Sequence, residues 1–125
     1  VDAKRMEIGR TAVWNRVTSV LGSADVIVCP TMSVPPGPAA KADHMVTRGD
    51  SAADGLLHSE DMTTVWNLVS PLPVVSVPCG TQRVDGIDLP VGMQIVGRPG
   101  REDVVLALAE WVEQRSGMEG RQPKD

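Results

Sequence analysis

Two short apolar runs, PVVSVPCG at residues 73–80 and LPVGMQIVG at residues 89–97, carry the main fold signal of this chain. Both are rich in β-branched residues and bounded by Pro and Gly, which is typical of buried strands. The polar segment between them contains Asp85-Gly86, a strong turn signal. The pattern predicts a β-hairpin. Neither strand alternates between apolar and polar residues, so we expect both faces to be covered, as in the middle of an α/β protein.

Length and composition limit the class of protein. The chain has 125 residues, 42% of them apolar, without Phe or Tyr, and a formal net charge of −4. Its basic residues are scattered, which predicts no nucleic-acid partner. No apolar run reaches the roughly 18 residues of a membrane span, and no signal peptide is visible, so no membrane partner is expected. Two cysteines without an export signal favour a cytoplasmic location.

The N-terminal part predicts a helix followed by a strand. Residues 3–21 place apolar side chains on one helical stripe, and Gly22 is a suitable stop signal. The stripe consists of Met6, Val13, Val17 and Val20, with Leu21 beside it. Residues 25–29, DVIVC, predict a strand buried on both faces. The chain begins almost inside its first helix, so we expect a further segment upstream.

The rest of the chain predicts a long loop and two more helices. Residues 30–60 are rich in Pro and Gly and predict a loop of unusual length, which suggests a functional role or disorder. A short helix is expected over residues 62–68, with Ser59 or Asp61 as its cap. A longer helix is expected over residues 101–116, closed by Gly117, followed by a polar tail at residues 118–125. Its apolar stripe is expected to be Val104, Leu108, Trp111 and Val112.

These elements are too few for a complete domain. Three strands buried on both faces need more covering than two long helices supply. We therefore expect an α/β fold that is incomplete on its own and belongs to a larger unit.

The order and spacing of these segments resemble the C-terminal end of amidase signature family enzymes. The matching segments are NLVSPLPVVSVPCG at residues 67–80, LPVGMQIVG at residues 89–97, and DVIVCPT at residues 25–31. The resemblance covers residues 13–112. It implies the C-terminal portion of the amidase-signature fold, a mixed central sheet covered by helices, with residues 1–125 forming a C-terminal segment of an amidase domain.

One departure concerns the subgroup. Many members carry Asn-x-x-Gly-x-Pro before the strand, whereas this chain has Asn67-x-x-Ser70-x-x-Pro73. Together with Met62-Thr63, this form resembles general amidases more than the glutamine-using amidotransferase subunits.

The resemblance implies a C–N hydrolase that acts on carboxylic amides and needs no cofactor. The family uses a nucleophilic Ser, a second Ser on a cis peptide bond and a Lys, with backbone N–H groups that hold the oxyanion. The lysines here are Lys4, Lys41 and Lys124, and none is followed by a Gly-Ser-Ser run. No catalytic residue is assigned, and we expect the isolated chain to be inactive.

Five residues are candidates for substrate binding: Thr31, Met32, Asp61, Thr63 and Trp66. Thr31 and Met32 follow a strand end, where α/β sheets often bind ligands, although a simple turn fits as well. Asp61 resembles the position of an acidic residue that recognises the substrate's amino group in glutamine-using relatives. A charge that interacts with the helix dipole is the preferred interpretation. Thr63 faces the same choice between a structural and a substrate-binding role. For Trp66, core packing is the preferred interpretation, and a wall of an apolar pocket is the alternative.

Other polar residues have structural interpretations. Asn67 is expected to bond to neighbouring backbone, and Gln94 must find partners within its buried strand. Cys29 and Cys79 are expected to be buried small hydrophobic residues. The histidines, His44 and His58, lie in the long loop, and the four residues lack the spacing of a zinc site.

The sequence leaves three functions open. The first is the C-terminal part of a hydrolytic amidase that acts on a small-molecule amide. The second is a non-catalytic structural or binding module that keeps the amidase sheet, and the third is part of the A subunit of a glutamine-dependent amidotransferase. In each case exposed sheet edges predict self-association or pairing with a missing N-terminal part.

Overall fold

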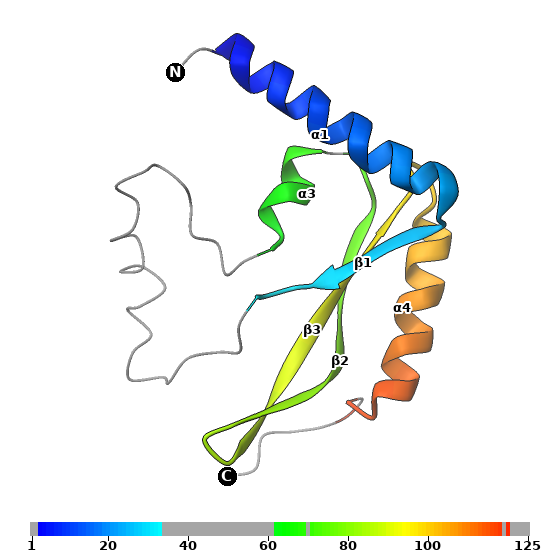
Figure 1. Ribbon diagram of the computed structural model, residues 1–125. Coiled ribbons are helices and arrows are strands. Elements are labelled where there is room, and N and C mark those ends of the chain that lie inside the picture. The colour runs from blue at the N-terminus through cyan, green and yellow to red at the C-terminus, as the bar shows by residue number, and fades with distance from the viewer. Residues whose placement is uncertain (1–2, 34–61, 70, 119, 121–125) are drawn as a thin grey trace.

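The computed structural model describes residues 3–33, 62–69, 71–118 and 120 of the chain (Figure 1). The long loop and polar tail predicted from the sequence lie almost entirely outside these residues. None of the described helices combines the length and apolar character needed to cross a membrane. In chain order the elements are α1 (Ala3–Ser23), β1 (Val26–Pro30), α3 (Thr64–Leu68), β2 (Val74–Val84), β3 (Ile87–Gly97) and α4 (Glu102–Ser116).

The predicted hairpin is confirmed, and its strands are longer than the apolar runs. β2 and β3 pair in antiparallel register up to Val84 opposite Ile87, so only Asp85 and Gly86 form the turn. Both turn residues have positive φ, 49° and 82°. This conformation matches the right-handed twist of the two strands, which explains why pairing extends into polar sequence.

β3 is the central strand of a three-stranded sheet with the order β1-β3-β2. β1 pairs antiparallel with β3, from Val26 opposite Gly97 to Pro30 opposite Met93. The predicted α/β class is therefore confirmed, and the described part of the sheet is antiparallel. β3 therefore pairs along both of its edges.

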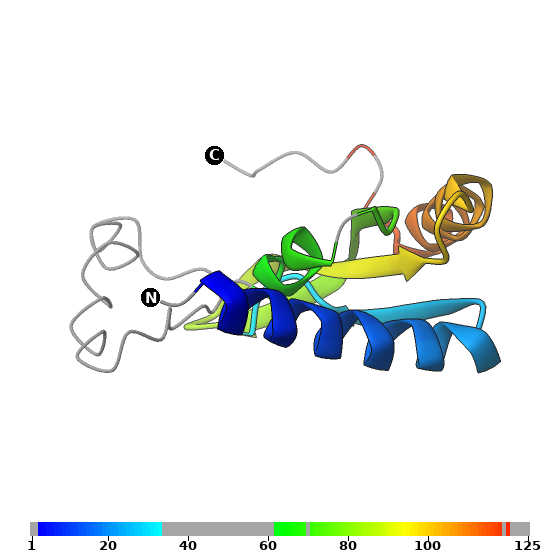
Figure 2. The same ribbon diagram turned by 90° about the horizontal axis from the view of Figure 1, so that it is seen from above.

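Helices cover the two faces of the sheet unequally. On one face, which we call the α4 side, Ile95 packs with Val77, Val105 and Ala109. On the opposite face, the α1 side, Val96 packs with a group that comprises Leu21, Val69 and Leu72. Successive residues of a strand point to opposite faces, so neighbouring residues of β3 serve two different cores. Figure 2 shows α1 and α4 on opposite sides of the sheet.

The expectation that all strands are buried on both faces is wrong for β1 and β2. Val28, in the middle of β1, is 48% exposed, and Val74, at the start of β2, is 38% exposed. α4 packs on β2 and β3. The continuous apolar run in β1 therefore lacks a complete cover among the described residues.

The buried stripe of α1 differs from the predicted one. Val13 and Val17 pack against the α1-side core together with Trp14, and Leu21 is part of that core. Met6 and Val20 are instead 62% and 50% exposed. The sheet contacts the C-terminal half of the helix, which changes the stripe, and the N-terminal half extends away from the strands in Figure 1.

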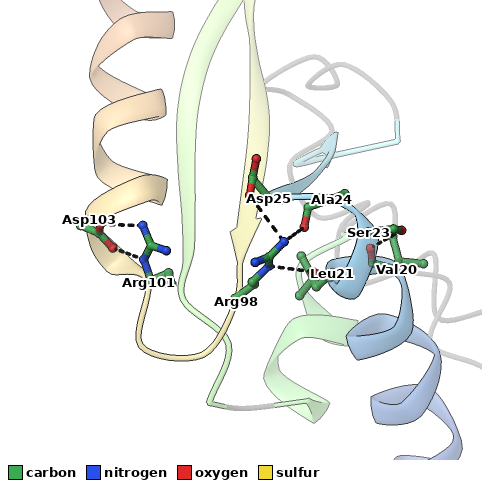
Figure 3. A network of polar contacts seen from close by, with 8 residues as sticks. All are labelled: Val20, Leu21, Ser23, Ala24, Asp25, Arg98, Arg101 and Asp103. Atoms are coloured by element: carbon green, nitrogen blue, oxygen red, sulfur yellow. Dashed lines mark hydrogen bonds and ion pairs between the residues drawn. The ribbon is translucent and has the colours of Figure 1, made fainter.

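α1 also continues through the predicted stop at Gly22 and ends at Ser23. Arg98, just after β3, caps this end (Figure 3). Its Nε donates to the Leu21 carbonyl at 2.7 Å, its NH2 group donates to the Ala24 carbonyl at 3.1 Å, and Asp25 lies 3.5 Å away. A cation at this position satisfies carbonyl groups that have no partner within the helix and interacts favourably with the helix dipole.

Replacing Arg98 with Met should therefore lower the free energy of unfolding by about 1–2 kcal/mol, since two charge-assisted hydrogen bonds are lost. Urea titration followed by circular dichroism measures this. The matched control is Arg83→Met, because Arg83 forms an exposed ion pair with Asp88 at 3.6 Å. That pair should contribute less than about 1 kcal/mol. Equal losses in the two variants would contradict the capping role.

α4 begins one residue later than predicted and buries part of the predicted stripe, since Leu108 and Val112 pack against the α4-side core. Val105 and Ala109 are buried, whereas Trp111 is 52% exposed and lies under the Arg115 guanidinium, 4.2 Å from its ring centre. Gly117 ends the helix with φ of 65°, as expected for a C-terminal glycine. Near the N-terminus, a bidentate hydrogen bond from Arg101 lowers the pKa of Asp103.

Candidate functional site

α3 and the α1 side of the hairpin enclose an open pocket of about 480 Å³, which we call the α3 pocket. Two of the predicted substrate residues, Thr63 and Trp66, lie in it. They come from the segment that leads into α3 and from α3 itself, whereas the facing wall comes from β2 and β3. The lining residues are Thr63, Trp66, Asn67, Leu72, Val74, Ser76 and Gln94.

Strand register places Ser76 and Gln94 side by side in the floor of this pocket. The two residues are directly opposite in the β2–β3 ladder, so their side chains share a face. Gln94 is 1% exposed, and its Nε2 donates to the Pro30 carbonyl at 3.0 Å and to Cys29 Sγ at 3.6 Å. The prediction that buried Gln94 must find partners is confirmed, and these bonds hold its carboxamide in a fixed orientation.

The lining of the α3 pocket mixes polar and apolar side chains and carries no charge. It offers hydroxyl groups and carboxamides beside Leu72, Val74 and the Trp66 ring, and no described lining residue is ionisable. Trp66 also packs against the α1-side core, so both interpretations of this residue hold. Its Nε1 is buried without an acceptor among the described residues. A buried donor in this state is costly.

Thr31 lies beside the α3 pocket and joins three segments. Its N–H donates to the Gly92 carbonyl at 3.0 Å, and its carbonyl accepts the N–H of Met62 at 3.1 Å. Its hydroxyl and the hydroxyl of Ser76 are hydrogen-bonded at 2.6 Å. Thr31 does not line the pocket itself, so it contacts the site through Ser76.

Met32 belongs to a second pocket of about 550 Å³, at the C-terminal end of β1. This pocket is mostly apolar and opens at the edge of β3, beyond the point where β1 stops pairing. Its lining residues are Val28, Cys29, Pro30, Met32, Ser33, Cys79, Gln82, Pro90, Val91, Gly92 and Met93. The structure thus brings Thr63 and Trp66 together and separates them from Met32. Asp61 lies outside the described residues.

The interpretation of both cysteines as buried residues is wrong for Cys79, which is exposed, and Cys29 is only half-buried. A β-bulge between Pro78 and Gly80 interrupts the ladder at Cys79, and the thiol donates to the Val91 carbonyl at 3.6 Å. The two cysteines lie on the outer strands with β3 between them. Two interstrand spacings, about 9–10 Å, therefore separate the two cysteines, which is too far for a disulfide bond. The described ranges contain no group of three or more acidic, His or Cys residues that would suit a metal ion.

Ser76 is one of the pocket residues that the sequence patterns did not reveal. A serine within the apolar run VVSVP has no distinctive pattern, and its role depends on its register opposite Gln94. Gln94 was noticed only as a buried residue that needs partners. A polar residue in each of two paired strands is the one signal that could have suggested their contact.

A family model described as Amidase matches residues 2–106 of the chain. The match covers α1, the three strands, the α3 pocket and the first turn of α4. The chain therefore belongs to the amidase signature family, and the resemblance inferred from the sequence is confirmed.

The chain is also similar to proteins named as the A subunit of glutamyl-tRNA(Gln) amidotransferase. It is 35% identical to the protein from Deinococcus radiodurans over 124 residues, which cover 98% of this chain and 24% of that relative. Identity to the Brevibacillus brevis protein is 36% over 122 residues, which cover 97% of this chain and 22% of that relative. Identity to the Methanosarcina barkeri protein is 35% over 117 residues, which cover 93% of this chain and 22% of that relative. The chain spans less than a quarter of the length of these relatives.

Proposed function

We propose that this chain is the C-terminal segment of an enzyme that hydrolyses the C–N bond of linear carboxylic amides. The family match over residues 2–106 carries this proposal. The reactive Ser, Ser and Lys of the family would lie in polypeptide beyond these 125 residues, since no lysine of the chain precedes a Gly-Ser-Ser run. The segment contributes the sheet and one wall of the substrate site.

In this proposal the α3 pocket holds part of the amide substrate. Its uncharged donors and acceptors suit a neutral carboxamide or acyl group, because recognition there depends on hydrogen bonds rather than charge. Thr63 and Trp66 form one wall of that pocket. Met32 would contact a more remote apolar part of the substrate, and Asp61 remains a candidate for an amino group.

A specific observation favours a second candidate function. The relatives from the three organisms are named as amidotransferase subunits, so this chain could instead come from an enzyme that passes ammonia from an amide to another acceptor. Cleavage of an amide C–N bond by an activated serine is common to both candidates. They differ in the amide used and in the fate of the ammonia.

Pairing with the rest of an amidase domain is part of the proposal. The outer edge of β1 has no partner among the described strands, and Val28 beside it is 48% exposed. An unpaired strand edge next to apolar surface favours the addition of another strand. In its absence we expect the chain to self-associate. A cytoplasmic location is part of the same proposal, since Cys29 and Cys79 are free thiols.

The test compares the purified 125-residue chain with a longer chain that carries the Ser and Lys segment upstream. Ammonia release is measured from glutamine and from a small neutral amide such as propionamide. The short chain should release no ammonia above background, and the longer one should hydrolyse at least one amide. Activity of the short chain alone, or none in the longer chain, would refute the proposal. Glutamine cleavage without propionamide cleavage would favour the amidotransferase candidate.

A further inference from the structure

We propose that Thr31 is a positioning residue, which sets the geometry of the α3 pocket without lining it. The expected effect of Thr31 on catalysis rests on the proposed function. Its effect on the geometry of the pocket does not, and is tested separately. The N–H of Thr31 bonds to β3, its hydroxyl bonds to β2, and its carbonyl bonds to the segment that leads into α3. The pocket wall that carries Thr63 and Trp66 depends on this junction.

α3 cannot determine its own position. It has five residues, far fewer than a helix needs to be stable in water by itself. Its location therefore depends on the contacts at its two ends. After the helix, Val69 and Leu72 are 1% and 9% exposed in the α1-side core. Before the helix, Met62 donates its N–H to the Thr31 carbonyl at 3.1 Å.

Close packing holds Thr31 itself in place. A Cβ atom at Gly92 would lie 2.8 Å from Thr31 Oγ1 and 3.4 Å from Ser76 Oγ. The glycine thus lets the two hydroxyl groups meet over β3. Since Pro30 has no N–H, the Thr31 amide supplies the next donor from this strand end to β3, at 3.0 Å from the Gly92 carbonyl.

The Thr31–Ser76 hydrogen bond links this junction to the pocket. Ser76 Oγ is a lining group, and at 2.6 Å from Thr31 Oγ1 its orientation is set by that bond. Loss of the Thr31 hydroxyl would free Ser76 and loosen the carbonyl that holds Met62. Both changes would reach Thr63 and Trp66, on the opposite wall of the pocket.

The structural test uses Thr31→Val in the longer chain that carries the upstream segment. Amide hydrogen exchange at Met62 and the indole N–H resonance of Trp66 are measured by NMR, with the latter assigned from Trp66→Phe. We expect Met62 exchange to rise on the order of 3- to 10-fold, which corresponds to the loss of about one hydrogen bond, and the Trp66 resonance to shift. Ser76→Ala should produce the same changes, and Thr31→Ser should restore the original values.

The matched control is Thr11→Val. The Thr11 hydroxyl donates to the Glu7 carbonyl at 2.9 Å within α1, on the exposed part of that helix. This variant loses a threonine hydroxyl and its bond but should leave Met62 and Trp66 unchanged. Unchanged signals in both Thr31→Val and Ser76→Ala would overturn the inference, as would equal changes in Thr11→Val. If Thr31→Val does not fold, Ser76→Ala provides the same comparison.

The consequence for function is tested in the longer chain with an amide that it hydrolyses. Thr31→Val should raise KM about 3- to 10-fold and leave kcat within about twofold, as expected when ground-state and transition-state binding weaken equally. An unchanged KM despite altered NMR signals would overturn the positioning role. Absence of hydrolysis in the unsubstituted longer chain would instead refute the proposed function, while the NMR comparison would still test the junction.

Discussion

Replacing Ile95 with Ala should lower the free energy of unfolding by about 2–5 kcal/mol, the largest effect that we expect from a single substitution in this chain. Ile95 is 0% exposed and packs with Val77, Val105 and Ala109 between the hairpin and α4. Ala would remove three carbon atoms and leave a cavity that the paired strands cannot close. Single domains are stable by only about 5–15 kcal/mol, so this loss is a large share of the total.

Urea unfolding followed by circular dichroism measures this change. Ile87→Ala is the matched control, because it deletes the same atoms from the same strand at a position that is 62% exposed. The control should change stability by less than about 0.5 kcal/mol. Similar losses in the two variants would mean that the α4-side core is not packed as described.

Gly97→Ala should be the second most damaging change. A Cβ atom at this position would overlap the Cγ2 of Val105 and lie 3.3 Å from Pro73 Cγ. Val105 is 2% exposed, and the Gly97 N–H donates to the Pro73 carbonyl at 2.9 Å. Overpacking of this kind costs about 1–3 kcal/mol, so the melting temperature should fall by several degrees.

The matched control is Gly9→Ala. A Cβ atom at Gly9 would meet no described atom within 4 Å, and the residue lies inside α1. Since Ala favours the helical conformation, this variant should be more stable by about 0.5–1 kcal/mol. A stable Gly97→Ala variant would show that α4 can move away from β3, and the assignment of Gly97 as a close contact would then be wrong.

The sequence predicted the helices, strands and turns better than it predicted which face of each element is buried. The hairpin was identified from its β-branched runs and Asp85-Gly86, because the turn conformation depends on those two residues alone. The buried face of a helix was harder to predict. Val13 and Val17 were identified correctly, but Met6 is exposed, because the sheet does not reach the N-terminal half of α1. Periodicity shows which side chains share a face, whereas the partner determines how much of that face is buried.

In the candidate site, too, local sequence predicted some of the residues, and others depend on tertiary contacts. Thr63 and Trp66 were selected from their place beside a short helix, and both line the α3 pocket. Ser76 was missed, because a serine within an apolar strand has no signal until the register places it opposite Gln94. The role of Thr31 as a junction depends on hydrogen bonds to residues 31, 45 and 61 positions away in the chain, which no local pattern encodes.

By itself, the sequence determined the α/β class, the hairpin, the helices and the amidase family, since each depends on residue type and short-range order. Only the tertiary structure decided which helix faces are buried, which polar groups meet in the α3 pocket and how Thr31 is bonded. These features depend on strand register and on close approach at Gly92, and both arise only when distant segments pack together.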